Sequence, residues 1–132
     1  MARITPKDRF YTKEHEWALD NGDGTVTVGI TDHAQELLTD IVFVELPEKG
    51  KVVAQMETLA VVESVKSVSD VYAPVGGRVV DVNGRLEEHP ELINNDPYGQ
   101  GWIAKIAMED PSELASLMDA EGYEAMIAQE SH

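Results

Sequence analysis

The chain contains no cysteine among its 132 residues. Disulfide bonds, zinc–thiolate sites and thiol nucleophiles are therefore excluded. Its longest apolar runs, such as IVFVEL, are far too short to span a bilayer. The first residues, MARITPKDRFYTKEHEW, lack both the apolar core of a secretory signal and the Arg- and Ser-rich composition of an organelle leader. We therefore expect a protein of the bacterial cytoplasm rather than of the mitochondrial matrix.

Basic residues are also scarce. The chain has 10 lysines and arginines against 25 acidic residues, a formal net charge of −15, with no basic residue between Lys13 and Lys49 or after Lys105. Nucleic-acid backbones and anionic lipid surfaces would be repelled, so neither is expected as a partner. The excess of negative charge has two interpretations, simple solubility or steering toward basic surfaces of partner proteins.

The length suits a single domain over residues 1–132. Short β-rich segments separated by turn residues predict a mostly β fold. NGDG joins the first two segments as a hairpin, and DIVFVELPEKG carries apolar residues on both faces, which is typical of a strand inside a sandwich or barrel. The expected strand segments are EHEWALD, TVTVGI, DIVFVEL, ETLAVVES, VSDVYAP, RVVDVN and WIAKIAM. We expect LEEHPELINNDPYGQG to be a loop.

Two helical regions are expected. The first covers about Asp32–Thr39, with Asp32 and Gln35 as a capping box. Its apolar stripe consists of Ala34, Leu37, Leu38 and Ile41. The second is a C-terminal extension over about residues 110–130, which starts with Asp110 as N-cap, Pro111 at the first helical position and Glu113 at the third, and which breaks near Asp119. Its apolar residues are Leu114, Leu117 and Met118, then Tyr123, Met126 and Ile127.

One lysine stands alone in the valine-rich stretch AVVESVKSVSDVYAP. Two strands flank Lys66, so it lies on the predicted hairpin turn Ser64–Ser67. That turn lacks the Gly or Asn of a tight two-residue loop, so we expect a wider reversal. An exposed lysine with a normal pKa is a poor base or nucleophile. It can, however, receive an acyl group from an enzyme that has activated that group, which creates a long uncharged arm.

The catalytic alternatives are weakly supported. Neither Ser64 nor Ser67 lies in a nucleophile-elbow pattern, which argues against a hydrolase. The four histidines, His15, His33, His89 and His132, are scattered and lack the spacing of a zinc-protease helix. An ordinary hydrated surface lysine on an acidic interaction module remains open at this point.

Several longer segments resemble those of a known protein family, and this resemblance favours a modified lysine. VGITDHAQELLTDIVFVELPEKG, VVESVKSVSDVYAPVGGRVVDVN and NNDPYGQGWIAKI resemble the H proteins of the glycine cleavage system, and YTKEHEW and DPSELASLMDAEGYEAMI are similar to the same family. The resemblance runs from about Phe10 to His132. It implies a lipoyl-domain-like β-sandwich or flattened barrel, a barrel-sandwich hybrid with short helices and a helical C-terminus.

The resemblance also implies a function. Lys66, in the attachment motif Glu63-Ser64-Val65-Lys66, would carry lipoate in amide linkage. The chain would be a carrier without catalysis of its own, which takes an aminomethyl group from glycine decarboxylase (P protein). It would deliver this group to the tetrahydrofolate-dependent aminomethyltransferase (T protein) and electrons to dihydrolipoyl dehydrogenase (L protein). A lipoate-attaching enzyme would be a further partner.

A cleft for the loaded arm is implied as well. The resemblance assigns to it two carboxylates, which would stabilise a cationic amine, and an apolar wall that would exclude water. The carboxylates are Glu16 and Asp70, and the wall is Ile30, Ala34 and Leu38. Without the family, surface acids and core packing would explain these residues. Glu14 departs from the family pattern, where a small hydroxyl residue is common, so it is left out of the site.

Related carriers are the nearest rivals. A biotin carrier would show methionines beside the lysine, whereas here Val65 and Ser67 flank it. Lipoyl domains of 2-oxoacid dehydrogenases typically resemble DKA at the turn and lack the helical extension. Two alternatives remain: a lipoyl or biotin carrier of another complex, and an unmodified interaction module. The intact mass of the native protein distinguishes a lipoyl increment, a biotin increment and no modification.

Overall fold

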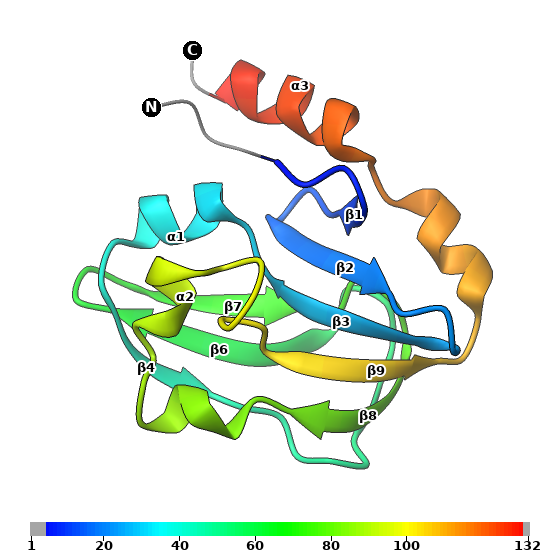
Figure 1. Ribbon diagram of the computed structural model, residues 1–132, viewed down its shortest axis with the longest axis horizontal. Coiled ribbons are helices and arrows are strands. Elements are labelled where there is room, and N and C mark those ends of the chain that lie inside the picture. The colour runs from blue at the N-terminus through cyan, green and yellow to red at the C-terminus, as the bar shows by residue number, and fades with distance from the viewer. Residues whose placement is uncertain (1–4, 131–132) are drawn as a thin grey trace.

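The structure is a computed structural model that describes residues 5–130. Its strands are β1 (Phe10–Tyr11), β2 (Glu16–Asp20), β3 (Thr25–Ile30), β4 (Ile41–Glu45), β5 (Val52–Val53), β6 (Thr58–Ser64), β7 (Val68–Tyr72), β8 (Gly77–Val82) and β9 (Ala104–Met108). Its helices are α1 (Asp32–Leu38), α2 (Leu92–Asn95) and α3 (Ala120–Glu130), with 3₁₀ turns η1 (Gly84–Glu87) and η2 (Pro111–Ser116). Figure 1 shows their arrangement.

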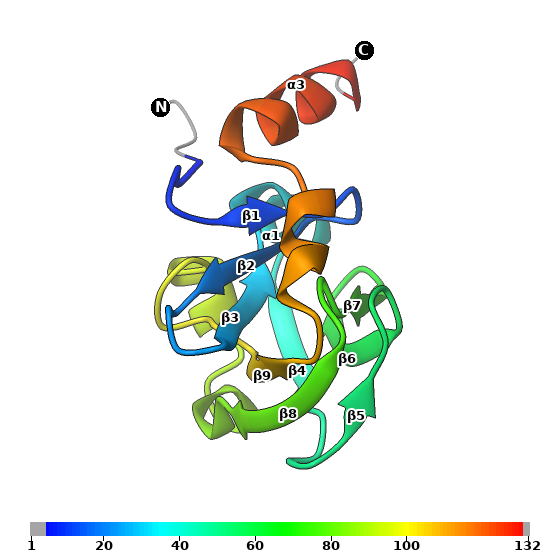
Figure 2. The ribbon, with the colours of Figure 1, turned by 90° about the vertical axis from the view of Figure 1, so that its right-hand side faces the viewer.

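Two antiparallel sheets form the body of the molecule. The larger has the order β1-β2-β3-β9-β8-β5 and the smaller the order β4-β6-β7. Valine, isoleucine, leucine and alanine side chains from both sheets make one buried cluster between them. A separate aromatic cluster, with Tyr11, Trp17 and Tyr123 at its centre, lies where α3 crosses β1 (Figures 1 and 2). The predicted class, a mostly β sandwich with short helices and a helical C-terminus, is confirmed.

The predicted hairpins are present. Gly22 and Gly24 have φ angles of 84° and 91° in the β2–β3 turn, a region that glycine occupies without strain. The β2–β3 pairing runs from Glu16 opposite Ile30 to Asp20 opposite Val26. The side-chain period of two then directs Val26, Val28 and Ile30 into the buried cluster.

The cap predicted for α1 is wrong by one residue. Thr31 is the N-cap, and its hydroxyl accepts a hydrogen bond from the Ala34 N–H. The Asp32 carboxylate instead accepts from the Gln35 side chain at 2.8 Å. Threonine and aspartate both cap helices, so adjacent candidates cannot be ranked from composition alone. Of the predicted stripe, Ala34 is buried, whereas Leu37 is 52% exposed.

The burial expected for both faces of the IVFVEL strand is wrong. β4 lies in the sandwich as the edge strand of the smaller sheet, and only one of its faces is buried. Ile41 and Val44 face the core, while Val42 and Phe43 are 53% and 49% exposed. An apolar pattern on both faces does not reveal whether a second layer covers the outer face.

The C-terminal extension breaks as predicted, but its first part is the 3₁₀ helix η2. Asp110 caps it by accepting from the Ser112 N–H. Glu113 does not close a capping box, since its carboxylate accepts from the Gly76 N–H at 2.8 Å and so holds η2 to the turn before β8. The segment expected to be an irregular loop contains η1 and α2.

Candidate functional site

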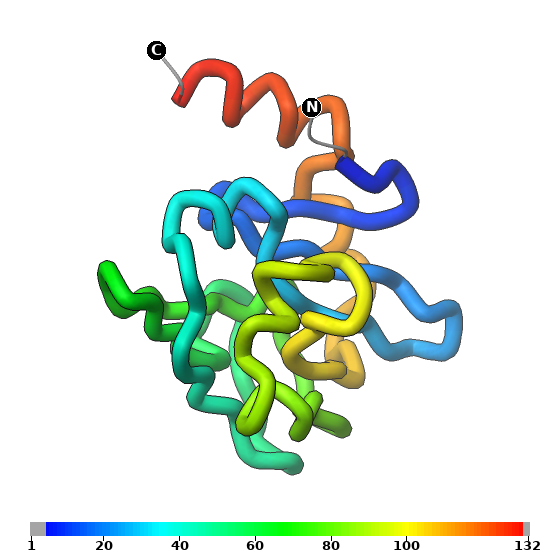
Figure 3. The backbone as a smooth tube through the Cα atoms, turned by 60° about the vertical axis from the view of Figure 1, so that its left-hand side comes forward, coloured from blue at the N-terminus to red at the C-terminus, as the bar shows by residue number. Residues whose placement is uncertain are grey.

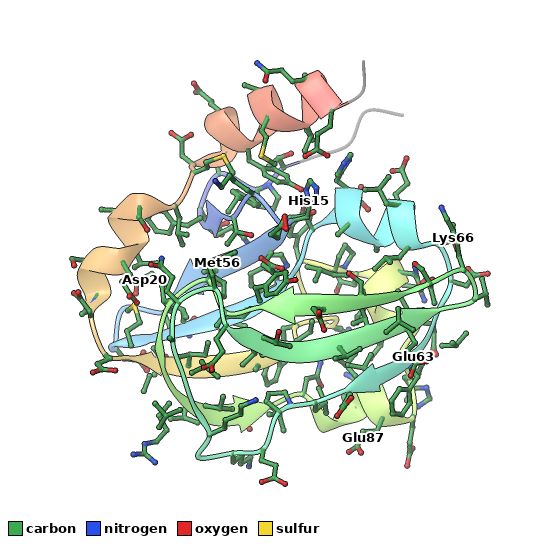
Figure 4. The ribbon with its side chains drawn as sticks, turned by 180° about the vertical axis from the view of Figure 1, so that it is seen from behind. His15, Asp20, Met56, Glu63, Lys66 and Glu87 are labelled. Carbon is green, nitrogen blue, oxygen red and sulfur yellow. The ribbon has the colours of Figure 1, made fainter. Side chains whose placement is uncertain are left out.

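Lys66 lies at the outer end of the β6–β7 hairpin, as predicted. The two strands pair from Thr58 opposite Tyr72 to Glu63 opposite Val68, and the hairpin projects from the body of the molecule (Figure 3). The lysine side chain is exposed and runs from the tip toward α1, with Glu63 on the preceding strand (Figure 4). A paired ladder therefore supports the exposed amine.

The hydroxyl of Ser64 organises the turn. It accepts hydrogen bonds from the backbone N–H groups of Lys66, at 3.1 Å, and Ser67, at 3.0 Å. The Ser64 N–H in turn donates to the Ser67 carbonyl at 2.8 Å, so the reversal covers the predicted residues 64–67. Side-chain acceptors of this kind replace the glycine or asparagine of a tight turn. The sequence placed Ser64 in the turn, but its role as the hydrogen-bond acceptor that holds the turn was not predicted.

The hairpin tip also rests on the segment after α1. The Val65 N–H donates to the Asp40 carbonyl at 3.0 Å, and the Lys66 ammonium donates to the Leu37 carbonyl at 3.1 Å. Over residues 5–130, no carboxylate lies within ion-pair distance of Lys66. The amine is therefore held by one surface hydrogen bond, which an acylating enzyme can break at small cost.

Exposed apolar side chains surround this tip. We call them the apolar rim: Leu37, Val42, Phe43, Val65 and Val68, with exposed fractions between 49% and 69%. Phe43 lies opposite Glu63 in the β4–β6 pairing, so β4 brings it alongside the hairpin. Clustered exposed apolar residues of this kind are typical of recognition surfaces.

The residues predicted to line the arm cleft differ in their environments. Ile30 and Ala34 are buried in the main core, and Leu38 packs against that core while partly exposed. Asp70 is exposed on β7, opposite Val61. The wall residues therefore have a packing role, whatever else they do.

Glu16 is 1% exposed and links the two sheets. One carboxylate oxygen accepts from the Thr12 hydroxyl and the other from the Tyr72 N–H, at 3.0 Å, so β2 is connected to β7. Burial raises the pKa of Glu16 to about 7, although the hydrogen bonds from Thr12 and Tyr72 act in the opposite direction. The carboxyl group therefore changes charge near neutral pH.

Two surface hollows lie elsewhere. One, of about 790 Å³, is bordered by residues 45–51 and 58–61, and the other, of about 320 Å³, by residues 11–13, 55–56 and 116–118. Neither is bordered by the residues of the predicted arm cleft. Among the described residues, no helix is both long and apolar enough to cross a membrane.

Sequence reasoning missed one cluster. His15 and His33, interpreted as scattered, have ring centroids 4.8 Å apart, and Glu130 lies beside both. The β2–β3 pairing brings the two histidines together, because one precedes β2 and the other follows β3. His89 lies apart from them near Glu91, and His132 lies outside the described residues.

Comparisons with known proteins agree with one another. The family model described as "Glycine cleavage H-protein" matches residues 9–130. A glycine cleavage system H protein of Thermus thermophilus is 60% identical over 126 residues, which are 96% of this chain and 98% of that protein. One from Escherichia coli is 56% identical over 125 residues, covering 95% of this chain and 97% of that protein. A crystal structure of a glycine cleavage system H protein from Mycobacterium marinum superposes with a TM-score of 0.86 at 40% identity, covering 94% of this chain and 99% of that chain.

Proposed function

Because the chain belongs to the glycine cleavage H-protein family, we propose that it is the lipoyl-bearing carrier of that system and performs no turnover alone. In this proposal it carries an aminomethyl group from glycine decarboxylase to the tetrahydrofolate-dependent aminomethyltransferase, and electrons to dihydrolipoyl dehydrogenase. A lipoate-attaching enzyme modifies it first. We also propose that it works in a bacterial cytoplasm, which the bacterial origin of its relatives supports. The net charge of −15 supports the absence of nucleic acid and membrane partners.

The observation that carries the proposal is the environment of Lys66. Its ε-amine is exposed on a paired hairpin, and its contact is a single carbonyl rather than a buried ion pair. Amide formation removes the ammonium charge, so an amine without a carboxylate partner loses little on modification. When attached, the lipoyl group supplies a disulfide that takes up the carried group and two electrons. The chain has no cysteine that could exchange with it.

The residues before the lysine have separable roles. Glu63 completes the strand pairing with Val68, and Ser64 holds the turn through two N–H groups. Val65 is 69% exposed and belongs to the apolar rim. We propose that partner enzymes recognise this rim. Its apolar side chains border the amine, so a bound partner would bury them and exclude water from the contact around Lys66.

The arm cleft stays part of the proposal. A cationic amine near Glu16 would favour the ionised carboxylate, and a pKa of about 7 means that such a charge could change its protonation under working conditions. Asp70 is exposed two residues before Tyr72, whose N–H binds Glu16. This two-residue separation supports the assignment of both carboxylates to one cleft.

Replacement of Lys66 by Arg tests the proposal. Arginine keeps the charge and the stem but cannot accept the acyl group. Lys66→Arg is expected to fold, to show no lipoyl mass increment after incubation with the attaching enzyme, and to give no glycine cleavage with the other components. Lys51→Arg, at an exposed lysine, is the matched control and keeps both activities. Full activity of Lys66→Arg would refute the proposal.

The intact mass of protein from its native host separates the rival carriers. A lipoyl increment supports the proposal, a biotin increment assigns a different carrier class, and an unmodified mass supports the interaction module. Peptide mapping then assigns any increment to a single lysine.

A further inference from the structure

His15, His33 and Glu130 come together from three separate parts of the chain. His15 ends the β1–β2 loop, His33 lies in the first turn of α1, and Glu130 is the last residue of α3. The Thr31 N–H donates to the His15 carbonyl at 3.0 Å, which holds the first two segments together. Figure 4 shows His15 below α3 and beside α1.

The distances match those between ligands of one small cation. His15 Nε2 lies 3.3 Å from a Glu130 carboxylate oxygen, and His33 Nε2 lies 3.4 Å from the same oxygen. All three ligand atoms lie within 4.8 Å of one another. A tetrahedral Zn²⁺ with bonds of about 2.1 Å places its ligand atoms about 3.4 Å apart. Two of the three spacings therefore already fit, and the third needs a small side-chain adjustment.

A hydrogen-bond chain behind His15 orients its ring. His15 Nδ1 lies 2.8 Å from the Tyr123 hydroxyl, which lies 2.7 Å from the Thr31 hydroxyl. Tyr123 is fully buried and its ring stacks on Tyr11 at 4.8 Å, so the hydroxyl is fixed. When Nδ1–H donates to the tyrosine, the Nε2 lone pair faces the Glu130 carboxylate. A second hydrogen bond of this kind is the usual support of a metal-binding histidine.

Charge and burial are consistent with a cation. The side chains of His15 and His33 are 16% and 11% exposed, and Glu130 is 41% exposed. An imidazole binds a metal ion through the lone pair of its neutral form. Among residues 5–130, no lysine or arginine forms an ion pair with Glu130, so a divalent cation between the three side chains would supply a positive partner for its carboxylate. A water molecule would then be the fourth ligand.

We propose that His15, His33 and Glu130 form a Zn²⁺ site that fastens α3 to the β1–β2 loop and α1. Two imidazoles and one carboxylate with an open fourth position are a ligand set typical of zinc. The three residues are far apart in the sequence, so no short metal-binding motif contains them. Lys66 is not among the three ligands, so the site does not require its modification.

The test uses the full chain without lipoate, so that no dithiol competes for the metal. Titration with Co²⁺ is followed by the visible absorption of tetrahedral cobalt, and Zn²⁺ is then added to displace it. We expect one saturable site, displacement of cobalt by zinc, and a zinc-dependent rise in the melting temperature, because a ligand that binds only the folded state stabilises it.

Variants assign the site. His33→Asn and Glu130→Gln are expected to lose the cobalt signal and the zinc-dependent melting shift, and Tyr123→Phe to weaken zinc binding by about 10–100-fold. His89→Asn is the matched control, because His89 also has a glutamate nearby, Glu91 at 3.2 Å, but belongs to no group of three possible ligands among residues 5–130. Circular dichroism of the metal-free variants checks that each is folded.

Two results would overturn the proposal. One is the absence of stoichiometric binding by the folded wild-type chain. The other is binding that persists in folded His33→Asn and Glu130→Gln, which would assign the metal to another part of the chain. Neither result affects the role of Lys66, which is tested by acylation.

Discussion

Replacement of Glu16 by Gln should change how stability depends on pH. The Glu16 carboxyl is buried, with its pKa raised from 4.5 to about 7. The folded protein therefore holds this proton up to about pH 7, whereas the unfolded chain releases it near 4.5. Where the folded state binds more protons, the free energy of unfolding falls as pH rises. Glutamine does not titrate, so this contribution disappears in Glu16→Gln.

The size of the effect follows from the two pKa values. A pKa difference of about 2.5, at about 1.4 kcal/mol for one pKa unit, gives about 3.5 kcal/mol over the full range. Between about pH 5.5 and pH 8, a window that avoids the isoelectric point of 4.4, about 2 kcal/mol of it is expressed. The free energy of unfolding of Glu16→Gln, minus that of the wild type, should rise by this amount.

The glutamine also has a pH-independent cost. Both oxygens of Glu16 accept hydrogen bonds, from Thr12 and from Tyr72, whereas an amide offers only one acceptor oxygen. The protonated carboxyl, which prevails below about pH 7, likewise has one acceptor oxygen and one donor, so glutamine resembles this form rather than the carboxylate. The free-energy difference between glutamine and the protonated carboxyl does not depend on pH, so it cancels between the two pH values.

Urea denaturation provides the measurement, since urea is uncharged and keeps the ionic strength constant. Fluorescence of Trp17, which is buried and donates to the carbonyls of Ile30 and Pro97, reports unfolding. Glu88→Gln, at an exposed glutamate, controls for the loss of one negative charge. A difference between Glu16→Gln and the wild type that stays constant from about pH 5.5 to pH 8 would refute the argument that burial controls this carboxyl.

Three further outcomes are expected. Ser64→Ala removes the acceptor of two turn N–H groups. It should lower the free energy of unfolding in urea by about 1 kcal/mol and slow the acylation of Lys66. An unchanged acylation rate would show that the turn needs no such support. Phe43→Ser should slow acylation by roughly fivefold or more if the apolar rim is recognised, while Val80→Ser, at an exposed valine on β8, should not. Asp70→Asn should shorten the lifetime of the carried aminomethyl group against hydrolysis, measured as release of formaldehyde or ammonia from loaded protein. An unchanged lifetime would show that Asp70 is an ordinary surface acid.

Local patterns predicted much of the fold. NGDG between two β-rich segments marks the β2–β3 hairpin, and the valine-rich segments around Lys66 mark the β6–β7 hairpin, because strands and turns depend on neighbouring residues. The predicted exposure of Lys66 is also confirmed. The family was identified from long matching segments, which composition and spacing alone could not have linked to glycine.

Predictions that depended on distant neighbours were less accurate. Phe43 and Leu37 follow apolar patterns that suggest burial, yet no layer covers them among the described residues. Glu113 was expected to cap its own helix but binds Gly76 instead. In each case a contact from elsewhere in the chain, or its absence, decided the outcome.

By itself, the sequence determined the hairpin that presents Lys66, since alternation and turn chemistry act within a few residues of one another. Only the tertiary structure decided that Glu16 is buried against Tyr72 and that His15, His33 and Glu130 meet. These contacts arise from the way the two sheets face each other and the way α3 crosses β1. The physical reason is that burial and through-space distance depend on segments far apart in the chain, about which a local pattern carries no information.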